Sequence, residues 1–128
     1  MIDIENEVFN RVASALRSNF TGISVYGERV ESPSSFPCVT IIEDDNYRPS
    51  GTVSLTKEQP MSANLMYTVD IYSNLRTGKK AQAKEMREVI DAEMCDMAFE
   101  QTYSYPTPNV DRTIYRYTVR YTKLIQFY

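Results

Sequence analysis

The segment TIYRYTVRY, residues 113–121, alternates between two kinds of side chain, and this alternation constrains the fold more than any other feature. Successive side chains of a β-strand point to opposite faces of the sheet. The first face consists of Tyr115, Tyr117, Val119 and Tyr121. The second face consists of Arg116, Thr118, Arg120 and Thr122. Because Val119 stands among the tyrosines, we predict that the first face packs against helices and that the arginine face points outward.

Two stretches place apolar residues at helical spacing, residues 4–20 and about residues 79–98. Asp3 is the expected N-cap of the first helix, and Gly22 is expected to end it. The apolar residues of the first helix are Val8, Phe9, Val12, Ala13, Leu16 and Phe20. Those of the second helix are Ala83, Met86, Ile90, Met94 and Met97. We interpret the methionines as core, and a flexible methionine-rich binding face is the alternative.

Apolar and β-branched runs predict strands at residues 23–27, 38–42, 65–72, 99–105 and 113–125. The order of elements is therefore α-β-β-β-α-β-β. Short connections favour mostly antiparallel pairing, with both helices on one face of the sheet. Since 128 residues suit one domain with a modest core, we predict a single α+β domain over residues 1–128.

The segment between the second and third strands is too long for a simple hairpin, and we expect it to project as an extended loop or a β-ribbon. Residues 45–63 are predicted to be mobile in the free subunit and ordered only in an assembly, because long loops in small domains tend to be functional. The candidate contact residues in this segment are Tyr47, Arg48, Leu55 and Lys57.

Charge and cysteine content argue against several classes of protein. Fourteen basic and seventeen acidic residues give a net charge of −3, whereas proteins that bind nucleic acid through its phosphates are usually basic. Cys38 and Cys95 form no C-x-x-C pair, so we predict reduced, packed thiols of a cytosolic protein. The N-terminal residues do not resemble a signal peptide, and no apolar run is long enough to cross a bilayer.

Enzymatic chemistry has little support in the sequence. Because the chain has no histidine, it cannot build a Ser-His-Asp or Cys-His arrangement or a zinc site that contains histidine. Glycine-rich phosphate-binding motifs are absent as well. The acidic run Glu43, Asp44 and Asp45 could contribute to a divalent-cation site, but one run does not supply converging oxygens. We favour a solvated loop mouth for this run and predict no metal and no catalytic residue.

The arginine face of the last strand has two interpretations. Arg116 and Arg120 either contact another subunit, as tyrosine and arginine often do at interfaces, or lie on an ordinary exposed strand where Asp70 neutralises an arginine. A nucleic-acid platform needs aromatic and basic residues on one face, and the alternation separates them. We favour the protein contact, with a small RRM-like nucleic-acid binder as the alternative.

The second predicted helix carries charge in the order that its macrodipole disfavours. Lys79, Lys80 and Lys84 lie near its positive end. Asp91, Glu93 and Asp96 lie near its negative end. Lys84 can reach Glu88, and Arg87 can reach Asp91, which partly compensates. The order is either tolerated surface variation or a sign that the two ends meet opposite charges on neighbouring copies of the chain.

The runs DIYSNLRTGKKAQAKEMREVIDAEM and YPTPNVDRTIYRYTVRY resemble small neck and tail-completion proteins of long-tailed bacteriophages, above all the tail terminator family. The resemblance spans about residues 36–125. The residues that carry it are Tyr72, Ser73, Asn74, Gly78, Lys79, Pro108, Asn109, Asp111, Tyr115, Arg116, Arg120 and Tyr121.

The resemblance implies a small α+β subunit of a virion ring, usually of six copies, that stops polymerisation of the tail tube and docks to the head–tail connector or head-closure protein. It implies no enzymatic activity, no cofactor and no membrane. DNA would pass through the ring without specific binding, and the subunit would remain in the host cytoplasm before assembly. Another neck or head-closure layer is the alternative within the same virion.

Overall fold

The computed structural model describes residues 4–28, 36–47, 62–75, 77–108 and 113–126. The elements in chain order are α1 (Glu5–Asn19), β1 (Ser24–Tyr26), β2 (Cys38–Tyr47), β3 (Ser62–Ser73), α2 (Lys79–Asp96), β4 (Glu100–Thr107) and β5 (Tyr115–Gln126). This is the predicted order. The helices and the five-stranded mixed sheet form one α+β domain, which confirms the predicted fold class.

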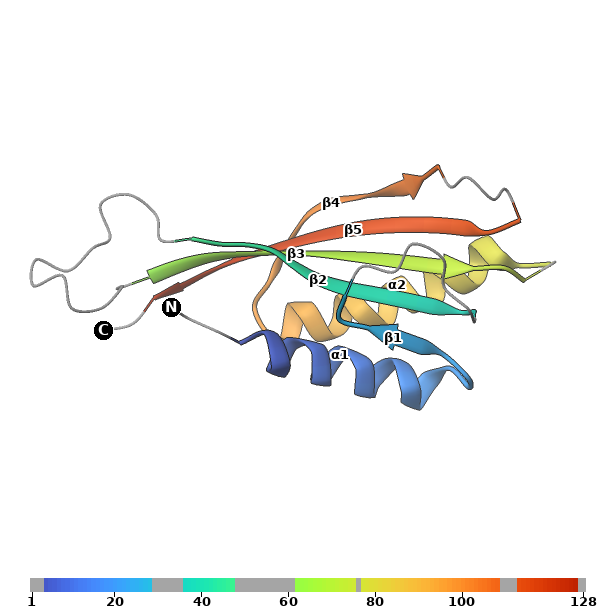
Figure 1. The fold of residues 1–128 in the computed structure, drawn as a ribbon, viewed down its shortest axis with the longest axis horizontal. Helices are drawn as coiled ribbons and strands as arrows, with labels where there is room; N and C mark the ends of the chain where they lie inside the picture. The colour runs from blue at the N-terminus through green and yellow to red at the C-terminus, as the bar shows by residue number, and fades with distance from the viewer. Residues whose placement is uncertain (1–3, 29–35, 48–61, 76, 109–112, 127–128) are drawn as a thin grey trace, which may run out of the picture.

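The sheet has the strand order β1-β2-β3-β5-β4, and both helices lie on one of its faces (Figure 1). The β2–β3, β3–β5 and β4–β5 pairs are antiparallel, whereas β1 pairs with β2 in parallel. The long strands β3 and β5 stay in register from Ser62↔Gln126 to Ser73↔Tyr115. The centre of the sheet is thus a pair of strands whose two faces meet different surroundings.

The core fills the space between the helices and one face of the sheet. Its fully buried side chains include Val8, Val12 and Leu16 of α1, Met86, Ile90 and Met94 of α2, and Leu65, Tyr67, Val69 and Ile71 of β3. These are the positions that helical and strand periodicity predicted. Because the methionines are buried, the alternative of a methionine-rich binding face is wrong.

The ends of the helices differ in part from the predictions. The N-cap of α1 is Ile4, which makes no side-chain capping bond, and the expected cap Asp3 lies outside the described residues. The C-cap of α1 is Phe20 in extended conformation, and the expected terminator Gly22 lies two residues beyond it with φ of +76°. The second helix begins after Gly78, whose φ of +86° is a left-handed conformation that favours glycine. It ends two residues earlier than predicted, at Asp96.

Strand β2 is longer than predicted, because it continues through the acidic run to Tyr47. A bulge between Glu43 and Asp45 lets the strand keep pairing with β3 as far as Tyr47↔Asn64. The acidic run is therefore part of a strand, and the predicted loop mouth is wrong. Of the two expected forms of this segment, a loop or a β-ribbon, the ribbon is confirmed for the residues of β2 and β3 that pair with each other. In Figure 1, β2, β3 and β5 extend beyond the end of the helices. Arg48, Leu55 and Lys57 lie outside the described residues, as does most of the segment predicted to be mobile.

Neither α1 nor α2 combines the length and the apolar character that a bilayer-crossing helix requires.

Candidate functional site

The tyrosine face of β5 is buried against the helices, as predicted. Tyr117 is 7% exposed, and Val119 and Tyr121 are fully buried. Tyr115 is half-buried and packs against the same core. Tyr67 of β3 is fully buried beside them and meets the ring of Phe99 edge to face, with centroids 5.4 Å apart. These tyrosines are core residues, which leaves the other face of the sheet as the candidate site.

Tyr117 and Tyr121 keep their hydroxyl groups at the edge of the core, where polar partners reach them, whereas the buried Tyr115 hydroxyl has no hydrogen-bond partner among the described residues. The Tyr121 hydroxyl donates to Asp91 Oδ1 at 2.9 Å. The Tyr117 hydroxyl accepts from Arg87 Nη1 at 2.9 Å and lies 2.8 Å from Ser104 Oγ. Burial, followed by the nearby Asp91 carboxylate, raises the pKa of Tyr121. These hydroxyls are therefore structural donors and acceptors.

The face opposite the helices, here called the open face, is formed by alternate residues of β3, β4 and β5. Its members are Met66, Thr68, Asp70 and Tyr72 of β3, Tyr103, Tyr105 and Thr107 of β4, and Arg116, Thr118, Arg120 and Thr122 of β5. The register places Tyr72 opposite Arg116 and Tyr103 opposite Arg120. Within β5, tyrosines and arginines lie on opposite faces, as predicted. For the sheet as a whole the prediction is wrong, because β3 and β4 place other tyrosines on the arginine face.

A polar network centred on Asp70 holds the middle of the open face. Asp70 is 8% exposed, and its Oδ1 accepts from Arg116 Nε at 3.1 Å and from Thr118 Oγ1 at 2.6 Å. Since Thr118 has one hydroxyl proton, Thr107 is the donor in the hydrogen bond between these two threonines. Arg116 also lies over the Tyr72 ring, 5.6 Å from its centroid. The predicted neutralisation of an arginine by Asp70 is confirmed, for Arg116.

Arg120 has a different environment from Arg116. It is exposed, its guanidinium lies 5.3 Å from the centroid of the Tyr103 ring, and it forms no ion pair within the described part of the chain. Tyr103 and Tyr105 are 38% and 40% exposed and meet edge to face at 4.3 Å. A hollow of about 470 Å³ lies between these residues and the Asp70 network. Tyrosine and arginine at a hollow are typical of residues that anchor a partner.

The candidate contact residues of α2 occupy the end of the helix far from the ribbon. Lys79 Nζ lies 3.5 Å from the carbonyl oxygen of Thr113, and Lys80 is exposed. The predicted pair of Arg87 with Asp91 does not form, because Arg87 contacts Glu88 at 3.2 Å and the Tyr117 hydroxyl instead. Tyr47, the remaining candidate, ends β2 beside Asn64.

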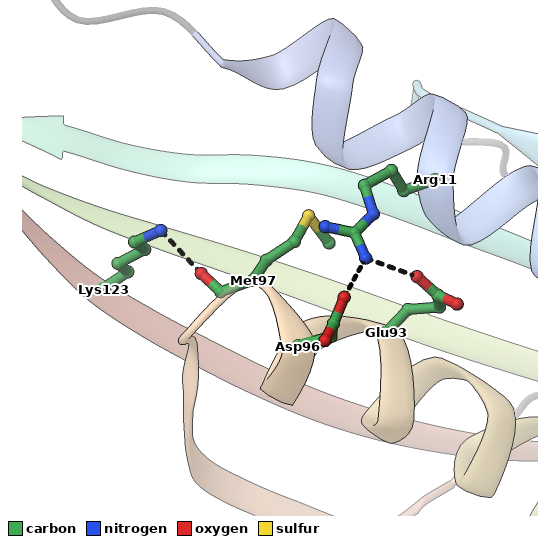
Figure 2. A network of polar contacts seen from close by, with 5 residues as sticks. All are labelled: Arg11, Glu93, Asp96, Met97 and Lys123. Atoms are coloured by element: carbon green, nitrogen blue, oxygen red, sulfur yellow. Dashed lines mark hydrogen bonds and ion pairs between the residues drawn. The ribbon is translucent and has the colours of Figure 1, made fainter.

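The acidic end of α2 has partners inside the subunit (Figure 2). Arg11 of α1 points between Glu93 and Asp96, with Nη2 3.2 Å from Glu93 Oε2 and paired with Asp96 as well. Lys123 Nζ donates to the carbonyl oxygen of Met97 at 2.6 Å, at the C-terminus of α2. The last turn of α2 has no basic residue of its own, so α1 and β5 supply the cations that its macrodipole favours.

Carboxylates and thiols do not converge on a reactive centre in the part of the chain that the structure describes. Glu43 accepts from the Tyr67 hydroxyl at 3.2 Å, and Asp44 accepts from Thr68. No cluster of three or more histidine, cysteine, aspartate or glutamate side chains suited to a metal ion occurs among the described residues. Both thiols are free, but only Cys38 is packed, since Cys95 is exposed. The prediction of a packed thiol is wrong for Cys95.

Sequence reasoning missed Tyr103 and Tyr105, two exposed tyrosines of the open face. Their spacing of two residues in a predicted strand placed them on a common face. It did not reveal that β4 pairs with β5 and aligns Tyr103 with Arg120, because that pairing joins strands across the sheet. Compared with known proteins, the chain matches no family model and no curated protein.

Proposed function

We propose that this chain is a structural protein of a long-tailed bacteriophage virion, a tail terminator that assembles into a ring, caps the tail tube and docks to the head–tail connector. The observation that supports assembly is the open face, where Tyr103, Tyr105 and Arg120 are exposed around a hollow. Tyrosine and arginine are enriched at the centres of protein interfaces. The bacteriophage setting and the ring, usually of six copies, come from the sequence resemblance.

The arrangement of charge on the open face suits docking better than catalysis. Asp70 is satisfied by Arg116 and Thr118, so these three residues form a hydrogen-bonded platform in the middle of the face. Arg120 forms no ion pair among the described residues, so an acidic group of a partner can pair with it. A head-closure protein or another neck layer would use the same features, and the two roles differ only in the surfaces that they bind.

The test has two parts, oligomeric state and action on tails. The purified chain should form a ring by analytical ultracentrifugation and negative-stain microscopy. Added to tail tubes that lack it, the chain should bind at one end and stop further polymerisation. A ring that binds the connector and not the tube would assign the chain to another neck layer. A chain that stays monomeric and binds neither the tube nor the connector would contradict the proposal.

A pair of variants connects this test to the open face. Tyr103→Ser/Tyr105→Ser removes the exposed aromatic anchors, and we expect it to abolish ring formation or tube capping while the subunit stays folded. Leu75→Ser is the matched control, because Leu75 is 43% exposed and follows β3 away from these tyrosines. Equal loss of assembly in the two variants would show that exposed apolar area in general, and not the open face, drives assembly.

A second candidate function has one specific observation in its favour. The open face combines the exposed Tyr103 and Tyr105 with two arginines, which is the combination that single-stranded nucleic acid needs for stacking and phosphate contact. Against it stand the net charge of −3 and the pairing of Arg116 with Asp70. Fluorescence anisotropy with short DNA and RNA oligonucleotides at low salt separates the two functions. Salt-dependent binding that Arg120→Ala removes would favour the nucleic-acid binder over the terminator.

A further inference from the structure

The two helices carry their charge in opposite orders along the chain. The first turn of α1 contains the acids Glu5 and Glu7, and its last turn contains Arg17. In α2 the first turn has no acid and the last turn has no base. Only α1 follows the order that a helix macrodipole favours. The order in α2 weakens that helix when it is considered alone.

Antiparallel packing of the helices brings like charges to the same end of the molecule. The contacts of Arg11 with Glu93 and Asp96 join the N-terminal half of α1 to the last turn of α2, and Figure 1 shows the helices running in opposite directions. One end, here called the acidic pole, consists of Glu5, Glu7, Glu28, Asp91, Glu93, Asp96 and Glu100. The other end, here called the basic pole, consists of Arg17, Lys79, Lys80 and Lys84. If α2 had acids in its first turn and bases in its last turn, as its macrodipole favours, those charges would have neutralised the charges of α1 at both ends of the helix pair.

Among the described residues, the acidic pole keeps a negative excess although Arg11 and Lys123 lie within it. Arg11 places one guanidinium between two carboxylates, and the ammonium of Lys123 is held by the Met97 carbonyl at the end of α2. Glu85 and Glu88 lie near the middle of α2, between the two poles, and Glu88 forms an ion pair with Arg87. The helix layer therefore has opposite charge at its two ends.

The acidic pole also contains a hollow of about 490 Å³ between the start of α1 and the end of β1. Glu5 and Glu28 belong to its lining, and Phe9, Val25 and Ile41 supply apolar surface. A lysine side chain matches this combination, because its methylene groups pack on apolar surface while its ammonium reaches a carboxylate. The basic pole presents Lys80 and Lys84 as exposed side chains.

We infer that copies of this chain associate pole to pole, with a lysine of the basic pole of one copy entering the acidic hollow of the next. The inference rests on the proposed ring function and identifies one contact between neighbouring subunits of that ring. The contact joins two different surfaces, so each added copy again offers a free pole, and the chain of copies closes into a ring when the rotation between neighbours allows it. Charge complementarity also excludes the like-to-like arrangement, in which two acidic poles would repel each other.

The experiment uses two variants of the full chain with opposite charge reversals. Lys80→Glu/Lys84→Glu reverses the charge of two exposed lysines of the basic pole, and Glu7→Lys/Glu28→Lys reverses the charge of two exposed carboxylates of the acidic pole. All four side chains are exposed, so the subunit should stay folded by circular dichroism. We expect each variant alone to self-associate at least about tenfold more weakly than the wild type in ultracentrifugation at low salt, because like charges now face each other.

An equimolar mixture of the variants should restore assembly, since every contact in an alternating arrangement again joins opposite charges. Rings that form equally well from the wild type and from each variant alone would overturn the pole-to-pole contact and leave the proposed ring function standing. Variants that fail to assemble both alone and together would also overturn the inference. A wild-type chain that stays monomeric and does not act on tails would overturn the proposed function and this inference together.

Discussion

The two faces of β5 come from one alternating sequence, yet different interactions stabilise them. On the helix side, Tyr117 and Tyr121 bury their rings in the core and use their hydroxyls at its edge. On the open face neither α1 nor α2 covers the strand, and Asp70 is satisfied by its neighbours within the sheet. Large apolar side chains need a second layer, whereas a hydrogen-bonded polar row remains stable at the surface. The uncovered face is therefore available for a partner without weakening the subunit.

The largest difference between the faces should appear on truncation of a buried tyrosine. Tyr117→Ala removes a nearly buried ring together with its contacts to Arg87 and Ser104, and we expect a loss of roughly 3 kcal/mol or more in the free energy of unfolding. Tyr103→Ala on the open face is the control, with an expected loss of about 1 kcal/mol or less. Urea denaturation measures both. Similar losses would mean that the open face is covered to the same extent as the core.

The Asp70 network should give the next largest effect. Asp70→Ala leaves the Arg116 guanidinium and the Thr118 hydroxyl without their acceptor, and we expect a loss of about 1–3 kcal/mol in unfolding free energy. A double-mutant cycle with Arg116→Ala isolates the pair, because the Arg116 side chain is 30% exposed and solvent weakens its contribution. Additive losses would show that Asp70 acts through Thr118 alone.

The pH dependence of the unfolding free energy can show that part of the open side of the sheet, at Cys38, is shielded from solvent. Cys38, opposite Tyr72 in the register, is fully buried, and burial raises its pKa to about 11. The folded state then holds the thiol proton more strongly than the unfolded state does. Its contribution to stability is complete below the ordinary thiol pKa of about 8.5 and is lost as the pH rises toward 11.

Between pH 8 and pH 10 we expect the wild type to lose about 1–2 kcal/mol of unfolding free energy through this thiol. Cys38→Ala should lack this part of the alkaline slope, although it is less stable at pH 8. Cys95→Ala is the matched control and should keep the slope, because Cys95 is exposed. Identical slopes in the two variants would mean that Cys38 ionises as freely in the folded state as in the unfolded state.

The sequence predicted the helix side of the molecule better than the open face. Alternation and helical spacing assign Val119, Tyr121, Met86 and Ile90 to the core, because burial of apolar side chains repeats with the period of the element. The same rules placed Arg116 and Arg120 on the opposite face. They did not bring Tyr103 and Tyr105 beside these arginines, since no local rule states which strands pair across a sheet.

Two further errors have similar causes. The acidic run at Glu43 and Asp44 suggested a loop because carboxylates are rare in strands, yet hydrogen bonds from Tyr67 and Thr68 on β3 hold it in β2. The expected pair of Arg87 with Asp91 obeyed helical spacing, but each residue instead contacts a tyrosine of β5. In both cases tertiary contacts outweighed a local preference.

Arg120→Glu should have the smallest effect on the unfolding free energy. It should also distinguish the two faces most clearly, because its effect on ring formation should be large. Arg120 is exposed, and its guanidinium lies over the Tyr103 ring and forms no ion pair among the described residues, so we expect a change of about 1 kcal/mol or less in unfolding free energy. Its effect on ring formation should be large, since reversed charge at a docked surface meets charge of the same sign on the partner.

Ser14→Glu, on the exposed side of α1, adds negative charge away from the open face and is the matched control. If Arg120→Glu preserves the unfolding midpoint and abolishes the ring while Ser14→Glu preserves both, Arg120 belongs to a contact between molecules. If Arg120→Glu instead lowers the unfolding free energy as much as Asp70→Ala does, the Arg120 guanidinium belongs to the Asp70 network. Tyr103 and Tyr105 would then have to bind the partner without Arg120.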